Sequence, residues 1–258
     1  MDEAYDLDEG LDPATVAASE PESPTDAATD PVYAVGIGPG NVEYLTGRAE
    51  RALAEADVVV GFETVVEFVS DATEADLLTC GYRDEGETLA AFARRVADGE
   101  RGVALLMGDP NHSGYQFVGK VQRAVDAPVR VVPGISSLQV AASRARTPME
   151  DTEFVTLHKS GSIEADLARL RGNVGQRHLL VLPRPFDWMP GDIAADLLEA
   201  GADPTLSALV FERLTHEDEA ITRTSLGDLA SSAGGDGRED TPYSDLSVLA
   251  VRAGERPF

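Results

Sequence analysis

The chain has a single cysteine, Cys80, so no disulfide can form within it. A lone thiol is typical of proteins that fold in a reducing compartment. No apolar run reaches the length that spans a bilayer, and the first 30 residues contain neither Lys nor Arg and no apolar core of the kind found in signal peptides. These absences predict a soluble cytoplasmic protein that does not bind a membrane.

Lysine is almost absent. Lys120 and Lys159 are the only two in 258 residues, while Asp and Glu together number 46 and give a formal net charge of -25. The acid is spread along the whole chain, which is typical of proteins from extreme halophiles that stay soluble in molar salt. The alternative is an acidic protein that binds basic partners. Nucleic-acid binding is disfavoured, because it needs clustered Lys and Arg.

The first apolar run ends in a glycine-rich loop that lacks the features of a phosphate site. A dinucleotide fingerprint has the spacing G-x-G-x-x-G, and Gly36 and Gly38 fit it, but Asn41 occupies the third position. Pro39 removes a backbone N–H that a phosphate would need. Asp57 precedes the second apolar run, whereas the acid of that fingerprint ends it. The loop therefore indicates close backbone approach without a phosphate.

Apolar runs alternate with segments of helical spacing from Pro31 onward. Each run is apolar throughout, as expected for a parallel or mostly parallel sheet covered by helices on both faces. The expected strands are 32–35, 56–60, 77–79, 103–107 and 129–132, and the expected helices are 44–53, 89–96, 115–125 and 136–146. Ligands of such sheets bind at the loops after the strands. The informative loops here are 36–40, 108–113 and 133–137.

A second α/β unit follows a pause near residues 147–151. Its expected strands are 154–157, 178–182, 206–211, 220–223 and 246–251, with helices over 163–170 and 193–200. Residues 1–30 are acidic, have no sustained apolar period and are predicted to be a disordered tail. We therefore expect this tail, an N-terminal α/β domain over 31–147 and a C-terminal α/β domain over 148–258, with a ligand cleft between the domains.

Taken one at a time, the polar loop residues have ordinary structural interpretations. Asp109 and Pro110 are common turn residues, and Ser136 or Ser137 can cap the following helix. Neither serine is placed as a hydrolase nucleophile, because Leu138 occupies the second glycine position of G-x-S-x-G. The four histidines show no ligand spacing, so no metal site is expected.

Taken together, the three glycine-containing motifs are specific enough to indicate a protein family. Gly36–Gly40, Gly108-Asp109-Pro110 and Pro133–Ser137, in this order and spacing, resemble the tetrapyrrole methylases, and the resemblance spans residues 31–252. It implies two α/β domains of the tetrapyrrole methylase type with S-adenosylmethionine in a cleft between them, bound mainly through backbone groups. The cofactor-binding residues that it implies are Pro39, Gly108, Asp109, His112, Ile135, Ser136 and Ser137, with Leu182, Leu209 and Phe211 from the second domain.

Within that family, several segments resemble the branch that methylates carbon C5 of the corrin precursor cobalt-precorrin-7. They are 56–61, Gly114 after Ser113, Gln139, 154–158 and 212–219. Lys159-Ser160 depart from this branch, which commonly has Gly-Arg there. The resemblance implies a homodimer and a corrinoid substrate rich in carboxylates, for which arginine is the expected partner. The candidate substrate-binding residues are Gly38, Arg48, Arg83, Arg144, Arg184 and Arg213.

Two other functions stay open. One is a methylase of the same fold that acts on another ring position, on RNA or on protein. The other is a non-catalytic nucleotide-binding module built around Gly36–Gly40. Methyl transfer from a sulfonium requires little acid–base catalysis by the protein, because the leaving group is neutral. Its main contribution is the alignment of the reacting atoms, so no catalytic side chain is predicted.

The net charge predicts that stability depends strongly on salt. Repulsion among carboxylates destabilises the compact state at low ionic strength, and the Debye length falls from about 10 Å at 0.1 M salt to about 3 Å at 1 M. We expect the melting temperature, measured by calorimetry, to rise steeply between dilute and molar KCl. Replacing surface Asp and Glu by Asn and Gln should flatten this rise. If the neutralised variant keeps the full salt dependence, generic salting-out of apolar surface is the cause instead.

Overall fold

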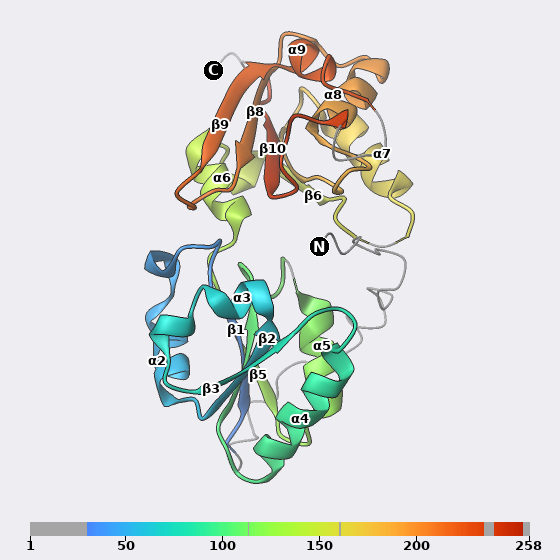
Figure 1. The fold of residues 1–258 in the computed structure, drawn as a ribbon. Coiled ribbons are helices and arrows are strands. Elements are labelled where there is room, and N and C mark those ends of the chain that lie inside the picture. Colours follow the sequence, from blue (N-terminus) through green and yellow to red (C-terminus); the bar gives the residue numbers. More distant parts are fainter. Residues whose placement is uncertain (1–29, 113, 160, 235–239, 255–258) are drawn as a thin grey trace. The chain divides into compact units, whose positions relative to one another are not determined.

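The computed structural model describes residues 30–112, 114–159, 161–234 and 240–254, and the chain divides between Ser136 and Ser137 into two compact units (Figure 1). We call residues 30–136 the N-terminal unit and residues 137–254 the C-terminal unit. The tail predicted over residues 1–30 lies, except for Asp30, outside the described residues. No helix in the described ranges has the length and apolar character needed to cross a membrane.

The N-terminal unit is built on a five-stranded parallel sheet with the strand order β3-β2-β4-β1-β5. Its strands are β1 (Val32–Gly36), β2 (Val58–Phe62), β3 (Asp76–Cys80), β4 (Gly102–Leu106) and β5 (Val129–Val132). Its helices are α2 (Gly47–Glu55), α3 (Glu63–Glu67), α4 (Glu85–Ala97) and α5 (Tyr115–Ala124), with 3-10 turns η1 (Val42–Tyr44) and η2 (Ser70–Ala72). The parallel sheet that the apolar runs predict is confirmed.

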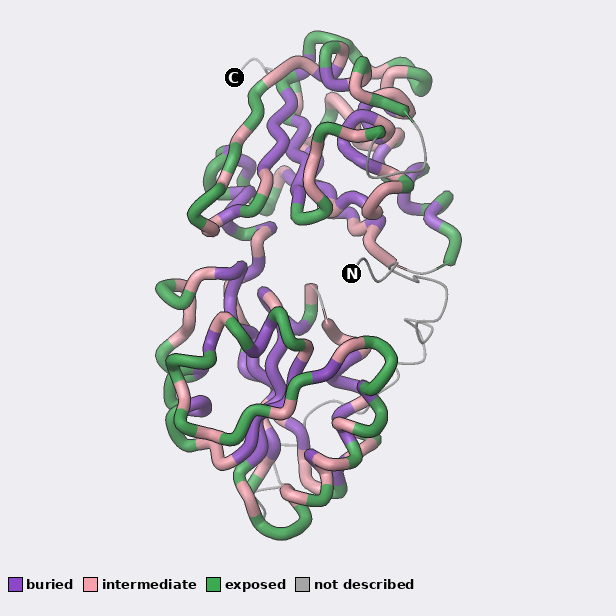
Figure 2. Tube along the Cα trace, viewed as in Figure 1, coloured by how far each residue is buried: buried purple, intermediate pink, exposed green. Residues whose placement is uncertain are grey.

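Helices cover both faces of this sheet. On one face, Leu53 of α2 and Val66 of α3 belong to the same buried cluster as Val59 and other strand residues. On the opposite face, Phe92 of α4 and Val121 of α5 belong to a second cluster with the alternate strand residues. Residues on both faces of the central strands are therefore buried, and these strands are mostly purple in the tube coloured by burial (Figure 2). This burial explains why the strands are apolar throughout.

The C-terminal unit contains a second five-stranded sheet, with the order β6-β7-β10-β8-β9. Its strands are β6 (Thr152–Thr156), β7 (His178–Leu182), β8 (Ser207–Glu212), β9 (Ala220–Ser225) and β10 (Ser247–Val251). β6 and β7 are parallel, whereas β10 is antiparallel to both β7 and β8, and β8 is antiparallel to β9. The helices are α6 (Ser137–Ala145), α7 (Glu164–Asn173), α8 (Pro190–Glu199) and α9 (Leu226–Ala230), with the 3-10 turn η3 (Met149–Asp151).

Three features of the fold differ from the sequence-based expectations. Helix α6 packs against β10 and β7, so the division between the units precedes this helix, whereas the pause in the sequence places the boundary at residues 147–148. The sequence does not predict α3 and α9, because helices of five residues are too short to show an apolar period. Strand β2 begins at Val58 instead of Ala56, because Asp57 ends the preceding turn.

Asp57 and Arg101 join the start of β2 to the start of β4, at the amino ends of the strands. The Asp57 carboxylate accepts hydrogen bonds from the Arg101 backbone N–H at 2.9 Å and from Nε and Nη2, each at 3.1 Å. The side-chain bonds first, and then the backbone bond, lower the pKa of Asp57 from 3.8 to about 2. Asp57 is thus a structural residue, remote from a ligand at the carboxyl ends of the strands.

This ion pair predicts a pH-dependent contribution to stability. Because the pKa of Asp57 is lower in the folded protein, the pair stabilises the fold above pH 3.8, and the contribution is lost as the pH falls toward 2. Asp57→Asn should lower the melting temperature at pH 7 in molar KCl, and most of this deficit should disappear by pH 2. Asp71→Asn, on the exposed turn η2, controls for the removal of one charge. A deficit that persists undiminished at pH 2 would contradict the assignment.

Candidate functional site

Three loops that the sequence singles out come together at one edge of the N-terminal sheet. All five strands of this sheet are parallel, so their carboxyl ends share one edge, which we call the carboxyl edge. Strands β4, β1 and β5 are neighbours in that order, and the loops 107–114, 37–40 and 133–136 follow them. The strand order therefore places these segments side by side, although they are far apart in the sequence.

The backbones of Gly36, Gly108 and Gly134 meet too closely for any side chain. A Cβ atom on Gly134 would lie 2.1 Å from the Gly108 carbonyl oxygen, and one on Gly36 would lie 2.5 Å from the same oxygen. Gly38 and Gly108 exchange two backbone hydrogen bonds of 3.3 and 2.8 Å, and both have positive φ, +86° and +65°. The contact between three chain segments accounts for these glycines without a phosphate, in agreement with the sequence-based interpretation.

Asp109 ties two of the loops together. Its side chain is buried, with 8% of the residue exposed. One carboxylate oxygen accepts a hydrogen bond from the Asn111 backbone N–H at 2.9 Å, and the other accepts one from the Gly134 N–H at 3.1 Å. His112 donates its backbone N–H to the Asp109 carbonyl oxygen at 3.0 Å. Asp109 therefore stabilises the turn in which it lies, as expected for a turn residue, and it also links the loop after β4 to the loop after β5.

The remaining cofactor candidates of the N-terminal unit lie along the same edge. Pro39 and Ser136 are buried, while His112 and Ile135 are half-buried. The Ser136 Cα lies 3.7 Å from the position that a Cβ on Gly108 would take, so this serine belongs to the contact region of the loops. The edge thus brings together all of the candidates that precede residue 137.

The other cofactor candidates belong to the C-terminal unit. Ser137 is the first residue of α6, and Leu182 is the last residue of β7. Leu209 and Phe211 lie in β8, where they are only 6% and 1% exposed, so their side chains are part of the unit's interior. Phe211 and Leu209 pair with β10, whose other neighbour is β7, and α6, which begins at Ser137, packs against both β10 and β7.

Two of the candidate substrate arginines lie in the N-terminal unit. The Arg48 guanidinium, on α2, lies 5.5 Å from the ring centroid of Tyr33, a distance at which a cation and an aromatic ring attract each other. Arg83 is exposed in the turn that follows β3, at the carboxyl edge. Gly38, the remaining substrate candidate, is buried in the backbone contact with Gly108.

The other three candidate arginines lie in the C-terminal unit, and each has an acidic partner there. Arg144 of α6 forms a two-pronged ion pair with Glu219. Arg213 pairs with Asp218. Arg184 is held most firmly: its side chain is 16% exposed, its Nε lies 3.0 Å from Asp187 and its Nη1 donates to the Gly161 carbonyl at 3.1 Å. The partners of Arg144 and Arg213 are neighbours in the chain, Glu219 and Asp218.

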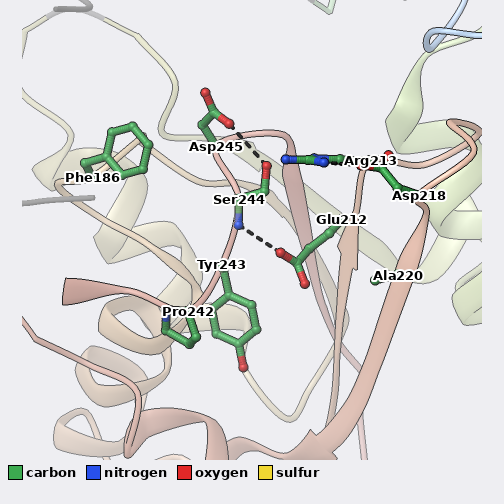
Figure 3. A pocket seen from close by; sticks show the side chains of 9 residues that line it. All are labelled: Phe186, Glu212, Arg213, Asp218, Ala220, Pro242, Tyr243, Ser244 and Asp245. Carbon is green, nitrogen blue, oxygen red and sulfur yellow. Dashed lines mark hydrogen bonds and ion pairs between the residues drawn. The ribbon is translucent and has the colours of Figure 1, made fainter. Parts of the chain in front are cut away.

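A cavity of about 450 Å³ opens in the C-terminal unit where β8 ends and β9 and β10 begin (Figure 3). Ser244 donates its backbone N–H to Glu212 at 2.8 Å and its hydroxyl to Asp245 at 3.1 Å. Of the lining residues, the sequence singles out Arg213 as a substrate candidate, and no periodic signal marks the aromatic ones. The lining residues are Phe186, Glu212, Arg213, Asp218, Ala220, Pro242, Tyr243, Ser244 and Asp245.

His158 and Lys159 follow strand β6. Burial holds the pKa of His158 below its ordinary value of 6.5; the charge of Arg184 acts in the same direction and that of Asp245 opposes it. Lys159 Nζ lies 2.5 Å from the carboxylate of Asp166 on α7, a buried residue. The Lys159 departure from the C5 branch therefore has a structural partner, while Ser160, like Ser113, lies outside the described residues.

Comparison with known proteins agrees with this architecture. A family model described as Tetrapyrrole (Corrin/Porphyrin) Methylases matches residues 31–230. A probable cobalt-precorrin-7 C(5)-methyltransferase of Methanocaldococcus jannaschii is 30% identical to this chain over 203 residues, which are 78% of this chain and 92% of that protein. The match thus extends over nearly the whole relative.

Solved structures of similar fold include the methyltransferase CobJ, with a TM-score of 0.70 and 23% identity over 89% of this chain and 98% of that one. A uroporphyrin-III C-methyltransferase from Thermus thermophilus, solved in complex with S-adenosylhomocysteine, has a TM-score of 0.63 and 26% identity over 86% of this chain and 92% of that one. The predicted fold class is confirmed, and this chain belongs to the tetrapyrrole (corrin/porphyrin) methylase family.

Proposed function

We propose that this protein transfers a methyl group from S-adenosylmethionine to carbon C5 of cobalt-precorrin-7. The observation that carries the proposal is the match to a probable C5-methyltransferase over 92% of that protein's length. It is supported by the segments 154–158 and 212–219, which resemble the C5 branch independently of the cofactor loops.

Family membership confirms the predicted enzyme class, a methyltransferase, and the predicted cofactor, S-adenosylmethionine. This cofactor supplies a methyl group on a positively charged sulfur. The loops at the carboxyl edge fit such a group: 36–40, 108–113 and 133–137 contain no Lys or Arg and one carboxylate, Asp109. Backbone amides and carbonyls with a single negative charge suit a cationic ligand with hydrogen-bonding groups, and they would bind a phosphate poorly.

We assign the cofactor to the loops of the carboxyl edge and to the further residues that the family resemblance implies. Asp109 holds the β4 and β5 loops in register, so that their backbone groups face the ligand in a fixed arrangement. Fixed positions are what methyl transfer requires, because alignment of the reacting atoms lowers the barrier more than proton transfer does. The residues assigned to the cofactor are Pro39, Gly108, Asp109, His112, Ile135, Ser136, Ser137, Leu182, Leu209 and Phe211.

The substrate is a corrinoid whose carboxylates pair with arginine. Arg144 and Arg213 pair with the carboxylates of Glu219 and Asp218, and binding of a substrate carboxylate would exchange one such anion for another. Gly38, Arg48, Arg83 and Arg184 complete the set of proposed substrate residues. We further propose a cytoplasmic homodimer that works in concentrated salt and binds no nucleic acid or membrane, in keeping with the net charge of -25.

Asp109 provides a test of the cofactor assignment. Asp109→Ala should weaken the binding of S-adenosylhomocysteine at least tenfold, about 1.4 kcal/mol, because the carboxylate and its hydrogen bond to the Gly134 N–H, which joins the two loops, are lost. Asp109→Asn keeps one acceptor oxygen and should lose less. Calorimetric titration in molar KCl measures both, with Asp126→Ala, on the exposed connection before β5, as the control. An unchanged dissociation constant in a folded Asp109→Ala variant would rule out the assignment.

The reaction itself can be identified from its product. Incubation of the purified protein with cobalt-precorrin-7 and S-adenosylmethionine should add one methyl group, and mass spectrometry with NMR should place it at C5. Methylation at another ring position, or activity only on RNA or protein, would exclude the C5 proposal and leave the family membership intact. Binding of S-adenosylhomocysteine without turnover of any of these substrates would favour a non-catalytic module.

A further inference from the structure

Three aromatic rings form a row along the carboxyl edge of the N-terminal sheet. Phe62 ends β2, Tyr82 follows β3 by two residues, and Phe117 lies in the first turn of α5. The ring centroids of Phe62 and Tyr82 are 5.0 Å apart and those of Phe62 and Phe117 are 5.5 Å apart, with interplanar angles of 50° and 53°. Tilted rings at these separations attract one another. We call these three residues the aromatic row.

The aromatic row adjoins the candidate cofactor loops both along the chain and across the sheet. The loop 107–114 links β4 to α5, and Phe117 comes three residues after Gly114, the N-cap of that helix. Strand β2, which ends in Phe62, is the direct neighbour of β4. The carboxyl edge thus has two adjacent parts: the glycine loops after β4, β1 and β5, and the aromatic row after β2 and β3.

Tyr82 is fixed in place although 55% of it is exposed. Its turn is closed by the carboxylate of Asp84, which accepts a hydrogen bond from the Gly81 N–H at 2.7 Å, and its ring rests on Phe62. An isolated exposed apolar side chain is ordinary in a soluble protein. A large aromatic ring that a turn and a second ring hold in one position offers a ligand a preorganised apolar face.

Arg83 is the next residue of the same turn and is exposed. The turn therefore presents an aromatic ring beside a guanidinium group. This combination matches a ligand with a broad apolar face and carboxylates at its rim, because the ring packs on the face and arginine binds a carboxylate with two parallel hydrogen bonds.

We propose that Tyr82 and Arg83 form a substrate subsite at the carboxyl edge: Tyr82, backed by Phe62 and Phe117, packs against the face of the corrinoid macrocycle, and Arg83 binds one of its peripheral carboxylates. The inference rests on the proposed function. It adds Tyr82, Phe62 and Phe117 to the residues that determine which substrate is accepted, and it gives Arg83 a defined neighbour.

Binding of cobyrinic acid, a stable corrin with peripheral carboxylates, tests this subsite in molar KCl by absorbance titration of the full chain. Tyr82→Ala should raise the dissociation constant about fivefold or more, and Tyr82→Phe, which keeps the ring, should stay within about twofold of the wild type. Arg83→Gln should raise it by a similar factor and reduce its dependence on salt. Leu77→Ala removes another exposed apolar side chain from β3, away from the carboxyl edge, and should change nothing.

The affinity for S-adenosylhomocysteine separates this subsite from the cofactor site and should be unchanged in all four variants. A Tyr82→Ala variant with wild-type melting temperature and wild-type affinity for cobyrinic acid would overturn the proposal. So would a change of oligomeric state in sedimentation without a change in corrin affinity, because the row would then be a contact between two copies of the chain. If the wild type binds cobyrinic acid through Tyr82 but does not methylate C5, the proposed reaction is wrong and the subsite holds.

Discussion

The contact of three backbones at Gly36, Gly108 and Gly134 is the constraint on which the carboxyl edge depends. The Gly108 carbonyl oxygen lies where a Cβ on either of the other two glycines would collide with it, so the loops after β1, β4 and β5 can meet only without side chains. The Asp109 carboxylate then fixes their relative positions through the Gly134 N–H. Loops that meet in this way offer backbone groups in place of side chains, as the proposed binding of the cofactor requires.

The acidic composition places a second constraint on the fold, because a buried carboxylate destabilises a protein unless a cation or a hydrogen-bond donor accompanies it. Both lysines of the chain serve this purpose: Lys120 pairs with the buried Glu85 and Lys159 with the buried Asp166. Asp109 is also a buried carboxylate, and it accepts hydrogen bonds from the backbone N–H groups of Asn111 and Gly134. These hydrogen bonds replace the water that a carboxylate loses on burial.

The carboxyl edge combines two kinds of surface on one sheet. The loops after β4, β1 and β5 have small residues and backbone contacts, whereas the ends of β2 and β3 have aromatic rings and Arg83. The strand order β3-β2-β4-β1-β5 puts β4 between them, and the loop after β4 leads into the helix that holds Phe117. A cofactor bound mainly by backbone and a substrate bound by side chains can thus occupy adjacent parts of one rigid edge.

The sequence by itself determined the parallel sheet, the positions of most strands and the identity of the glycine loops, because each depends on local patterns: continuous apolar runs, and glycines at strand ends. The sequence also places Asp57 before an apolar run, and therefore at the opposite end of a strand from the loops that bind ligands.

Only the tertiary structure decided three other features: the short helices α3 and α9, the placement of α6 with the C-terminal unit, and the partners of Arg144, Arg184 and Arg213. The tertiary structure alone also decided the contacts of the aromatic row and the hydrogen bond from Gly134 to Asp109. The residues that meet in these contacts are separated along the chain by connections of different length. Which residues meet across a sheet depends on the lateral order of its strands, and no local pattern in the sequence encodes that order.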